Sequence, residues 1–276
     1  MAHDLTVKRD FMKERIAKNI NVLSRFLGMR DVPSLTKQAF QQKYGIEQAD
    51  LMVLFGGSIL KGADVLARAI QNDAARKYII VGGAGHTTET LRQVVHGNYP
   101  KIETAGQSEA QIFQAVLESV YHVKADYLEC QSTNCGNNIT FLLDLIRENN
   151  LPFDSIILVQ DAAMQRRMDA GLRKYVSDPL IINYAAYQVD VSVDNDQLVY
   201  TENIPGMWQM DRFIALLMGE IPRLSDDAQG YGPNGQGFIA HVEIPEDVSK
   251  AFEELKEAGI STVRTANPAF ASTNSL

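Results

Sequence analysis

The sequence predicts an α/β protein built on a doubly wound, mainly parallel sheet of about five strands, with helices on both faces. Two observations support this fold class. Short apolar runs alternate with helical patterns along residues 50–183, and four of these runs are followed directly by turns of glycine and polar residues. Because the turns after parallel strands open at one edge of a sheet, we expect the four turns to form one ligand site.

Two helices are predicted ahead of the first strand. Residues 4–28 carry apolar side chains mostly three to five positions apart, which is typical of one face of a helix. Residues 34–44 form the second helix, with Ser34 as its N-cap and Gly45 as its stop. Exposure of the first apolar stripe would support a homodimer; its members are Phe11, Ile16, Ile20 and Leu23.

Strands and helices then alternate through the middle of the chain. The predicted strands are 50–55, 77–81, 127–130, 155–160 and 179–183. The predicted helices are 62–72, 87–95, 108–120, 137–148 and 163–175. The helix at 108–120 begins with a capping-box pattern, because Ser108 is followed three residues later by Gln111.

Beyond residue 185 the pattern is less regular. Residues 189–200 are either a hairpin about Asp194 and Asn195 or a loop. The remaining expectations are a helix at 208–218, a glycine-rich loop at 225–237, a strand at 238–244, a helix at 246–258 and a disordered tail over the last dozen residues. No composition break indicates a second domain. Residues 1–276 are therefore treated as one α/β domain with a helical N-terminal segment (1–48), a core (49–185) and a C-terminal elaboration (186–276).

The composition narrows the class of protein. A net charge of −8 argues against a general nucleic-acid or anionic-membrane binder, since both favour basic surfaces. Cys130 and Cys135 fit neither redox nor zinc-finger spacing. No apolar stretch is long enough to cross a bilayer, and residues 1–30 lack a signal-peptide core. We therefore expect a cytoplasmic protein without membrane insertion.

Two glycine turns suggest an anion site. One contains Gly56, Gly57 and Ser58, and the other contains Gly82, Gly83 and Gly85. Backbone N–H groups without a neighbouring Cβ, close to a helix N-terminus, suit a phosphate or carboxylate. The alternative is that these glycines only make tight strand-to-helix turns.

The other candidate residues are polar. Ser132, Thr133, Asn134 and Asn137 follow the third strand and would recognise hydroxyls or a phosphate, or else form a polar turn. Two basic side chains, Arg166 and Arg167, lie in the first turns of a helix, the unfavourable end of its dipole. They would clamp an anion, or form a structural ion pair with Glu109 or Asp161.

Glu109 and His86 are the candidate acid–base groups. The alternative for Glu109 is that its negative charge simply stabilises the start of a helix. The alternative for His86 is that it is a capping or surface residue. Asp161 is a ligand-binding candidate or an N-cap. A Ser58–His86–Asp161 triad and a metal site of Glu109, Asp161 and His86 have no support in the spacing, and no metal is predicted. The sequence lacks the motifs of dinucleotide-binding loops, P-loops, HExxH zinc sites and GxSxG nucleophile elbows.

At these residues the chain resembles the bacterial YdcF-like family, an uncharacterised group that also includes the SanA and ElyC proteins. The resemblance runs through the turns, from Gly82–His86 and Ser108–Ala110 to Gln131–Asn137 and Gln160–Arg167. It continues in the C-terminal strings Gly219–Leu224, Asp226-Asp227, Gly230–Pro233, Phe238-Ile239 and His241-Val242. The resemblance implies a Rossmann-like three-layer α/β/α sandwich with its site at the strand C-termini. The glycine-rich loop at 225–237 is either a surface loop or a lid over that edge of the sheet.

Two functions remain open from the sequence. The first is binding of a phosphorylated or nucleotide-like small molecule at the C-terminal edge of the sheet, as a hydrolase or transferase. The second is a non-enzymatic ligand-binding or sensor module, for example for S-adenosylmethionine. The expected partner is thus an anionic or adenosyl small molecule, with S-adenosylmethionine or a nucleotide as the candidate cofactor.

Overall fold

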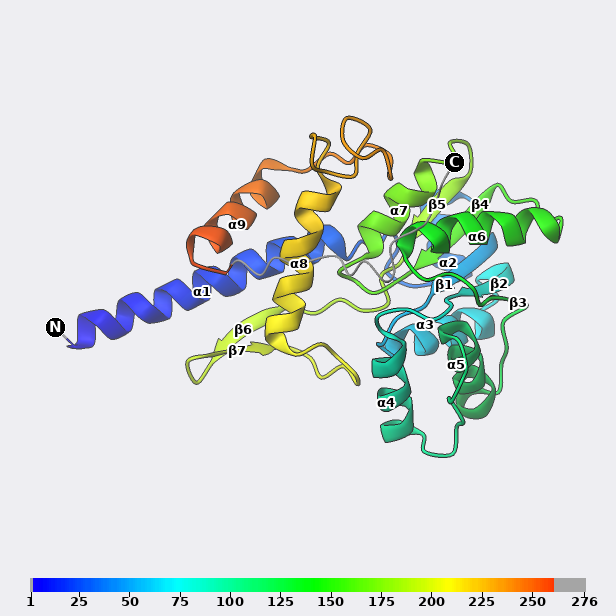
Figure 1. Ribbon diagram of the computed structural model, residues 1–276, viewed down its shortest axis with the longest axis horizontal. Coiled ribbons are helices and arrows are strands. Elements are labelled where there is room, and N and C mark those ends of the chain that lie inside the picture. The colour runs from blue at the N-terminus through cyan, green and yellow to red at the C-terminus, as the bar shows by residue number, and fades with distance from the viewer. Residues whose placement is uncertain (1, 261–276) are drawn as a thin grey trace.

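The computed structural model describes residues 2–260, and their side chains from residue 12 onward. Five parallel strands form one sheet in the order β3-β2-β1-β4-β5 (Figure 1). Their bounds are β1 Ala49–Phe55, β2 Ala75–Val81, β3 Tyr127–Glu129, β4 Ser155–Val159 and β5 Leu180–Asn183. The predicted parallel α/β fold class is confirmed.

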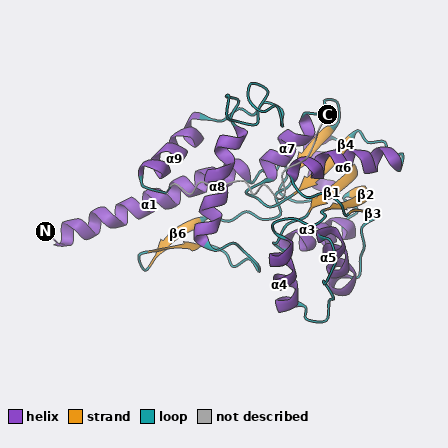
Figure 2. Ribbon diagram, in the orientation of Figure 1, coloured by secondary structure: helices purple, strands orange, loops and turns teal. Residues whose placement is uncertain are grey.

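The central strand β1 is buried on both faces, and its side chains alternate between two cores. Val53 and Phe55 face a core shared with helices α6 and α7. Met52 and Leu54 face a larger core shared with α3 and α5. Figure 2 shows the resulting helix–sheet–helix layers. The helices of this part are α2 Lys37–Tyr44, α3 Lys61–Gln71, α4 Thr88–Asn98, α5 Glu109–Val116, η1 Leu117–Tyr121, α6 Cys135–Glu148 and α7 Gln165–Arg173.

Local capping agrees with the sequence at two of three sites. Ser108 and Gln111 form the predicted capping box at the start of α5. Gly45 ends α2 in the left-handed conformation, with φ 72°. The predicted N-cap Ser34 is wrong, because α2 begins at Lys37 and Thr36 Oγ1 accepts from the Ala39 N–H. Ser34 instead hydrogen-bonds the Thr36 hydroxyl at 3.1 Å.

The first and last parts of the described chain pack together beside the sheet (Figure 1). The elements are α1 Ala2–Leu27, β6 Val191–Asp194, β7 Gln197–Tyr200, α8 Met210–Leu224 and α9 Glu246–Glu257. Arg15 and Asn19 of α1 both bond Glu254 of α9, at 2.7 and 2.8 Å. Asn21 pairs with both backbone groups of Val191 in β6. The N-terminal segment and the C-terminal elaboration therefore form one layer.

The hairpin alternative for residues 189–200 is confirmed, with its turn one residue later than predicted, because Asp194 pairs with Gln197. β6 and β7 pair antiparallel, and both turn residues, Asn195 and Asp196, have positive φ, at 47° and 64°. Asn and Asp tolerate this conformation better than most residues, as in tight hairpin turns.

The strand predicted at 238–244 is wrong. The N–H groups of Phe238 and Ile239 both donate to Tyr231 O, and that of Ala240 donates to Ala170 O in α7. These donors are satisfied by a loop and a helix, so no strand ladder forms. The alternating apolar pattern instead reflects Ile239 packing into the core while Phe238 lies on the Tyr231 ring. The predicted disordered tail lies outside the described residues.

The apolar stripe of α1 is used inside the chain. Ile20 and Leu23 are fully buried in the large core, and Ile16 packs against it. These three side chains therefore leave no exposed face for a dimer, and the side chain of Phe11 lies outside the described ones. Among residues 2–260, no helix is long and apolar enough to cross a membrane.

Replacing Leu23 with alanine tests this packing. We expect Leu23→Ala to lower the free energy of unfolding by about 2–5 kcal/mol, because a fully buried leucine leaves a cavity. The measurement is urea denaturation at two protein concentrations. Lys18→Ala, an exposed change on the same helix, should shift stability by less than about 0.5 kcal/mol. A Leu23→Ala effect that depends on protein concentration would instead place this residue in a dimer interface.

Candidate functional site

The strand order reverses between β1 and β4, which makes this the topological switch point of the sheet. In open α/β sheets, ligands bind outside the carboxyl ends of the strands at such a point. The turns after these two strands lie side by side here: a methyl group added at Gly57 would come 3.7 Å from Gln160 Oε1. A cavity of about 10 Å³, room for about one water molecule, lies in the same place and is lined by Leu54, Phe55, Gly57, Ile59, Gly62, Phe113, Gln160, Asp161 and Ala186.

Asp161 is a buried carboxylate at the rim of this cavity. Its Oδ1 accepts from the Tyr187 hydroxyl at 2.8 Å and from the Ala163 N–H at 2.9 Å. Its Oδ2 accepts from Trp208 Nε1 at 2.8 Å. Burial raises the pKa of Asp161, and these hydrogen bonds oppose part of that rise. Asp161 caps the turn before α7 rather than the helix itself, which begins four residues later at Gln165.

Glu109 is the second buried carboxyl group at this edge, only 6% exposed. Its Oε1 accepts from the hydroxyls of Thr87 and Thr88, at 2.8 and 2.9 Å. Desolvation raises the pKa of Glu109 above the usual glutamate value, so it holds a proton to higher pH than an exposed glutamate. A carboxyl group tuned in this way can act as a general acid.

Gly56 and Gly82 make room for Glu109. A methyl group at Gly56 would overlap Glu109 Oε2, and one at Gly82 would come 3.1 Å from Glu109 Cβ. The carboxyl group therefore reaches the ends of β1 and β2 only because both residues are glycine.

The N–H groups of four predicted anion-binding glycines are used within the chain. Gly56 donates to Val81 O, Gly82 to Glu129 O, Gly83 to Ser132 O and Gly85 to Thr88 Oγ1. The distances lie between 2.7 and 3.0 Å. These four residues accordingly act as close-packed turn residues, which was the plainer of the two alternatives.

Ser58 lies between this turn and α3 and is 1% exposed. Its Oγ is buried and has no hydrogen-bond partner among the described residues. A buried hydroxyl group without a partner is uncommon in folded proteins and calls for an explanation.

The polar residues after β3 are brought to the same edge and bond mainly to one another. Ser132 Oγ accepts from the Gly83 N–H at 3.2 Å, which ties this loop to the turn after β2. Asn134 is the N-cap of α6, and its side chain and the Thr133 hydroxyl both donate to Asn137 Oδ1. Ser132 is therefore a structural link, while Thr133 remains exposed to solvent.

Both candidate arginines have internal partners. The Arg167 guanidinium forms two bonds with the fully buried Glu220 of α8, at 2.5 and 3.0 Å. Arg166 donates to Phe26 O at 2.6 Å and stacks on the Phe26 ring. The structure thus pairs Arg167 with Glu220 rather than with Glu109 or Asp161. His86 lies exposed in the turn between β2 and α4.

The glycine-rich loop at 225–237 is closed on itself. The Asp226 and Asp227 carboxylates accept backbone N–H groups of the loop, and the Tyr231 N–H donates to Arg223 O of α8. Asp226 Oδ2 also bonds His241 Nδ1 at 2.8 Å. These bonds tie the loop to the end of α8. The segment over the switch point is another one, 201–209.

Sequence reasoning missed the aromatic partners of Asp161. Tyr187 and Trp208 lie 26 and 47 positions further along the chain, each in a segment without a motif. Trp208, the single tryptophan of the sequence, was the one available signal. Its indole N–H usually finds a partner when buried.

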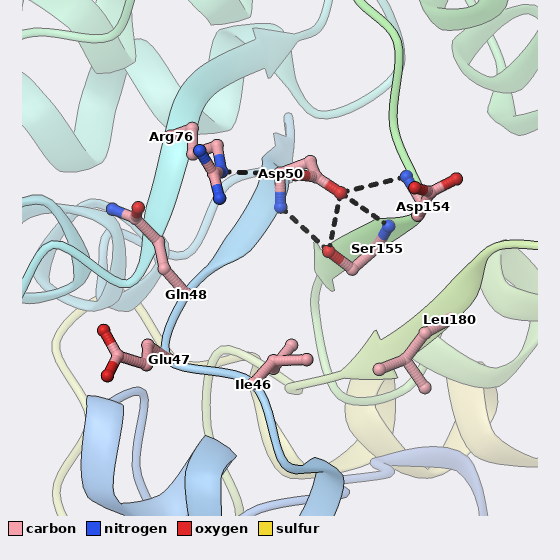
Figure 3. A pocket seen from close by; sticks show the side chains of 8 residues that line it. All are labelled: Ile46, Glu47, Gln48, Asp50, Arg76, Asp154, Ser155 and Leu180. Carbon is pink, nitrogen blue, oxygen red and sulfur yellow. Dashed lines mark hydrogen bonds and ion pairs between the residues drawn. The ribbon is translucent and has the colours of Figure 1, made fainter.

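A surface pocket at the opposite edge has a structural role (Figure 3). Asp50 Oδ2 accepts from the N–H groups of Asp154 and Ser155 and from the Ser155 hydroxyl, at 2.9 to 3.0 Å. Arg76 adds an ion pair with Asp50 Oδ1 at 3.3 Å. These bonds staple the beginnings of β1 and β4 together, away from the carboxyl ends of the strands.

Comparison with known protein families adds no assignment, because no family model matches the chain.

Gly83 tests the close packing of the turns. A methyl group there would overlap Ser132 O and come 2.8 Å from Gln131 C, both backbone atoms that cannot yield easily. We expect Gly83→Ala to lower the free energy of unfolding by about 1–3 kcal/mol, measured by urea denaturation. Gly97→Ala in α4, where nothing lies within 4 Å, should instead raise stability slightly. Equal effects at the two sites would contradict the packing argument.

Glu109→Gln tests the buried carboxyl group. The pKa of Glu109 is raised by folding, so its favourable contribution is present below the ordinary glutamate pKa of 4.5 and is lost as pH rises through the folded-state pKa. Glutamine mimics the protonated form and can accept from both threonines. The variant should therefore match the wild type near pH 4 and become the more stable protein above that window. Thermal denaturation from pH 4 to 8 measures this. A constant difference across that range would show that Glu109 does not titrate there.

Proposed function

We propose that this protein binds a phosphorylated or nucleotide-like small molecule at the C-terminal edge of the sheet, and that Glu109 is the acid–base group of a hydrolase or transferase reaction. The observation that carries the proposal is the buried Glu109 carboxyl group, held by two threonine hydroxyls beside the ends of β1 and β2. Burying a carboxyl group away from water lowers the free energy of unfolding. Such groups concentrate in active sites, where their shifted pKa values are used.

Two helix ends support the choice of a phosphorylated ligand. α3 and α4 follow the two glycine turns, and neither has a side-chain cap at its N-terminus. The same holds for α7, α8 and α9, whereas α2, α5 and α6 are capped by Thr36, Ser108 and Asn134. The partial positive charge of an uncapped helix N-terminus favours an anion. The two ends would take the place of the arginine clamp, since Arg166 and Arg167 have internal partners.

The raised pKa of Glu109 fits the same ligand. A protonated carboxyl group does not repel a phosphate, and it can deliver its proton to the oxygen of a leaving group. In this proposal Glu109 is the general acid, the ligand binds outside the carboxyl ends of β1 and β2, and Thr87 and Thr88 keep the carboxyl group oriented.

A second candidate function is a non-enzymatic sensor for an adenosyl ligand such as S-adenosylmethionine. One observation favours it: both candidate arginines have internal partners, because Arg167 pairs with Glu220 and Arg166 bonds Phe26 O. A site without an arginine clamp suits a sulfonium ligand better than a phosphate.

We also propose kinship with the YdcF-like family. Its support is the set of turn residues together with the C-terminal strings, such as Gly219–Leu224 and Gly230–Pro233.

Binding assays separate these functions. We expect ATP or glucose 6-phosphate to bind the wild type by isothermal titration calorimetry, and Gly57→Val to weaken binding at least about tenfold by placing a branched side chain in the turn after β1. Glu109→Gln should keep affinity within about threefold and reduce turnover by about 10²–10⁴-fold, the usual contribution of a general acid.

Gly97→Ala serves as the control and should bind as the wild type does, because it lies at the far end of α4. Binding of S-adenosylmethionine alone, without turnover in wild type or Glu109→Gln, would favour the sensor. No binding of any of the three compounds below about 1 mM, or unchanged affinity in Gly57→Val, would refute the proposed site.

A further inference from the structure

The segment 201–209 joins β7 to α8 and loops out toward α4 (Figure 1). It contains no helix or strand. Its tip reaches the turn after β1 and the helix α4: a methyl group on Gly206 would come 2.9 Å from Val94 Cγ1 and 3.5 Å from Ser58 O. Ile204 is buried in the core, whereas Pro205 is exposed.

One side-chain hydrogen bond ties this segment to the sheet edge. Trp208 Nε1 donates to Asp161 Oδ2 at 2.8 Å. The Tyr200 hydroxyl donates to Trp208 O at 3.0 Å and so holds the same residue from the hairpin side. Tyr187 fixes the other oxygen of Asp161. Asp161 therefore serves as the anchor of the segment, and Trp208 is the residue it holds.

Beneath the segment lie features that a permanently closed site does not explain. The Ser58 hydroxyl group is buried without a hydrogen-bond partner among the described residues, and it adjoins a small, mostly apolar cavity that Gln160 and Asp161 also line. A buried polar atom without a partner calls for an explanation, such as a functional role. The Ser58 hydroxyl group and the adjoining cavity fit a ligand site that becomes accessible when segment 201–209 moves away.

We propose that residues 201–209 form a strap, latched by the Trp208–Asp161 hydrogen bond, which lifts to admit a ligand to the switch point. Ser58 then becomes a hydrogen-bonding group for a hydroxyl or phosphate oxygen of that ligand. The identity of the ligand rests on the proposed function; the motion of the strap does not. The strap, and not the glycine-rich loop at 225–237, is the lid of this site.

Trp208 reports the motion directly, because it is the only tryptophan. Two variants weaken the strap: Asp161→Ala removes the anchor, and Gly206→Ala places a Cβ at φ 79° against Val94. We expect amide hydrogen exchange in 201–209 to accelerate about tenfold in Asp161→Ala, as for the loss of one hydrogen bond, and to accelerate in Gly206→Ala through backbone strain, with unchanged exchange in β1 and β4. Acrylamide quenching of Trp208 should rise in both variants, without ligand.

Asp50→Ala is the matched control, since it removes a carboxyl group that also accepts three hydrogen bonds but lies at the opposite edge. It should leave the exchange of 201–209 and the quenching of Trp208 unchanged. Unaltered exchange and quenching in both strap variants would overturn the proposal. So would a wild-type strap that exchanges as fast as an unstructured peptide.

Ligand addition separates the strap from the proposed function. Adding ATP or S-adenosylmethionine should shift Trp208 emission whenever calorimetry detects binding, and Gly206→Ala should increase the association rate. Binding with unchanged emission and unchanged association rate would overturn the gating role and leave the proposed function standing. If exchange and quenching increase in the strap variants but neither compound binds, the result would support the strap and count against the proposed function.

Discussion

The fold depends on a central strand that is buried on both faces. β1 sends alternate side chains into two cores, so helices must cover both sides of the sheet. It also pairs with β2 on one side and β4 on the other, which places the reversal of strand order beside its own carboxyl end. Asp50 fastens the beginnings of β1 and β4, and the turns at their other ends are left to form a site.

At the candidate site, closely packed glycine backbone lies next to buried carboxyl groups. Gly56 and Gly82 matter because they allow the carboxyl group of Glu109 to lie against the strand ends. Asp161, across the switch point, holds two aromatic side chains instead. One carboxyl group thus sits among hydroxyls at the strand ends, while the other anchors the covering segment. This division explains why two acidic residues at one sheet edge would have different roles.

The internal partners of Arg166 and Arg167 change their interpretation from anion ligands to structural residues. At the start of α7 a basic side chain opposes the helix dipole, so a nearby anion is expected. That anion is Glu220, a residue 53 positions away on α8, and the pair joins the sheet layer to the layer formed by α1, α8 and α9. Arg166 stacks on Phe26 of α1 and strengthens the same junction. Both arginines hold the two parts of the molecule together.

The sequence by itself determined the elements that depend on local patterns. Apolar runs placed the five strands, and the Ser108–Gln111 pair placed the start of α5, because these signals act over a few residues. Only the tertiary structure decided which partner each polar group meets. Trp208 on Asp161, Glu220 on Arg167 and Ser132 on Gly83 are contacts between segments distant in sequence. The strand pattern at 238–244 failed for the same reason, because its backbone donors found acceptors in Tyr231 and Ala170. Such pairings are set by how layers pack, and no local periodicity encodes them.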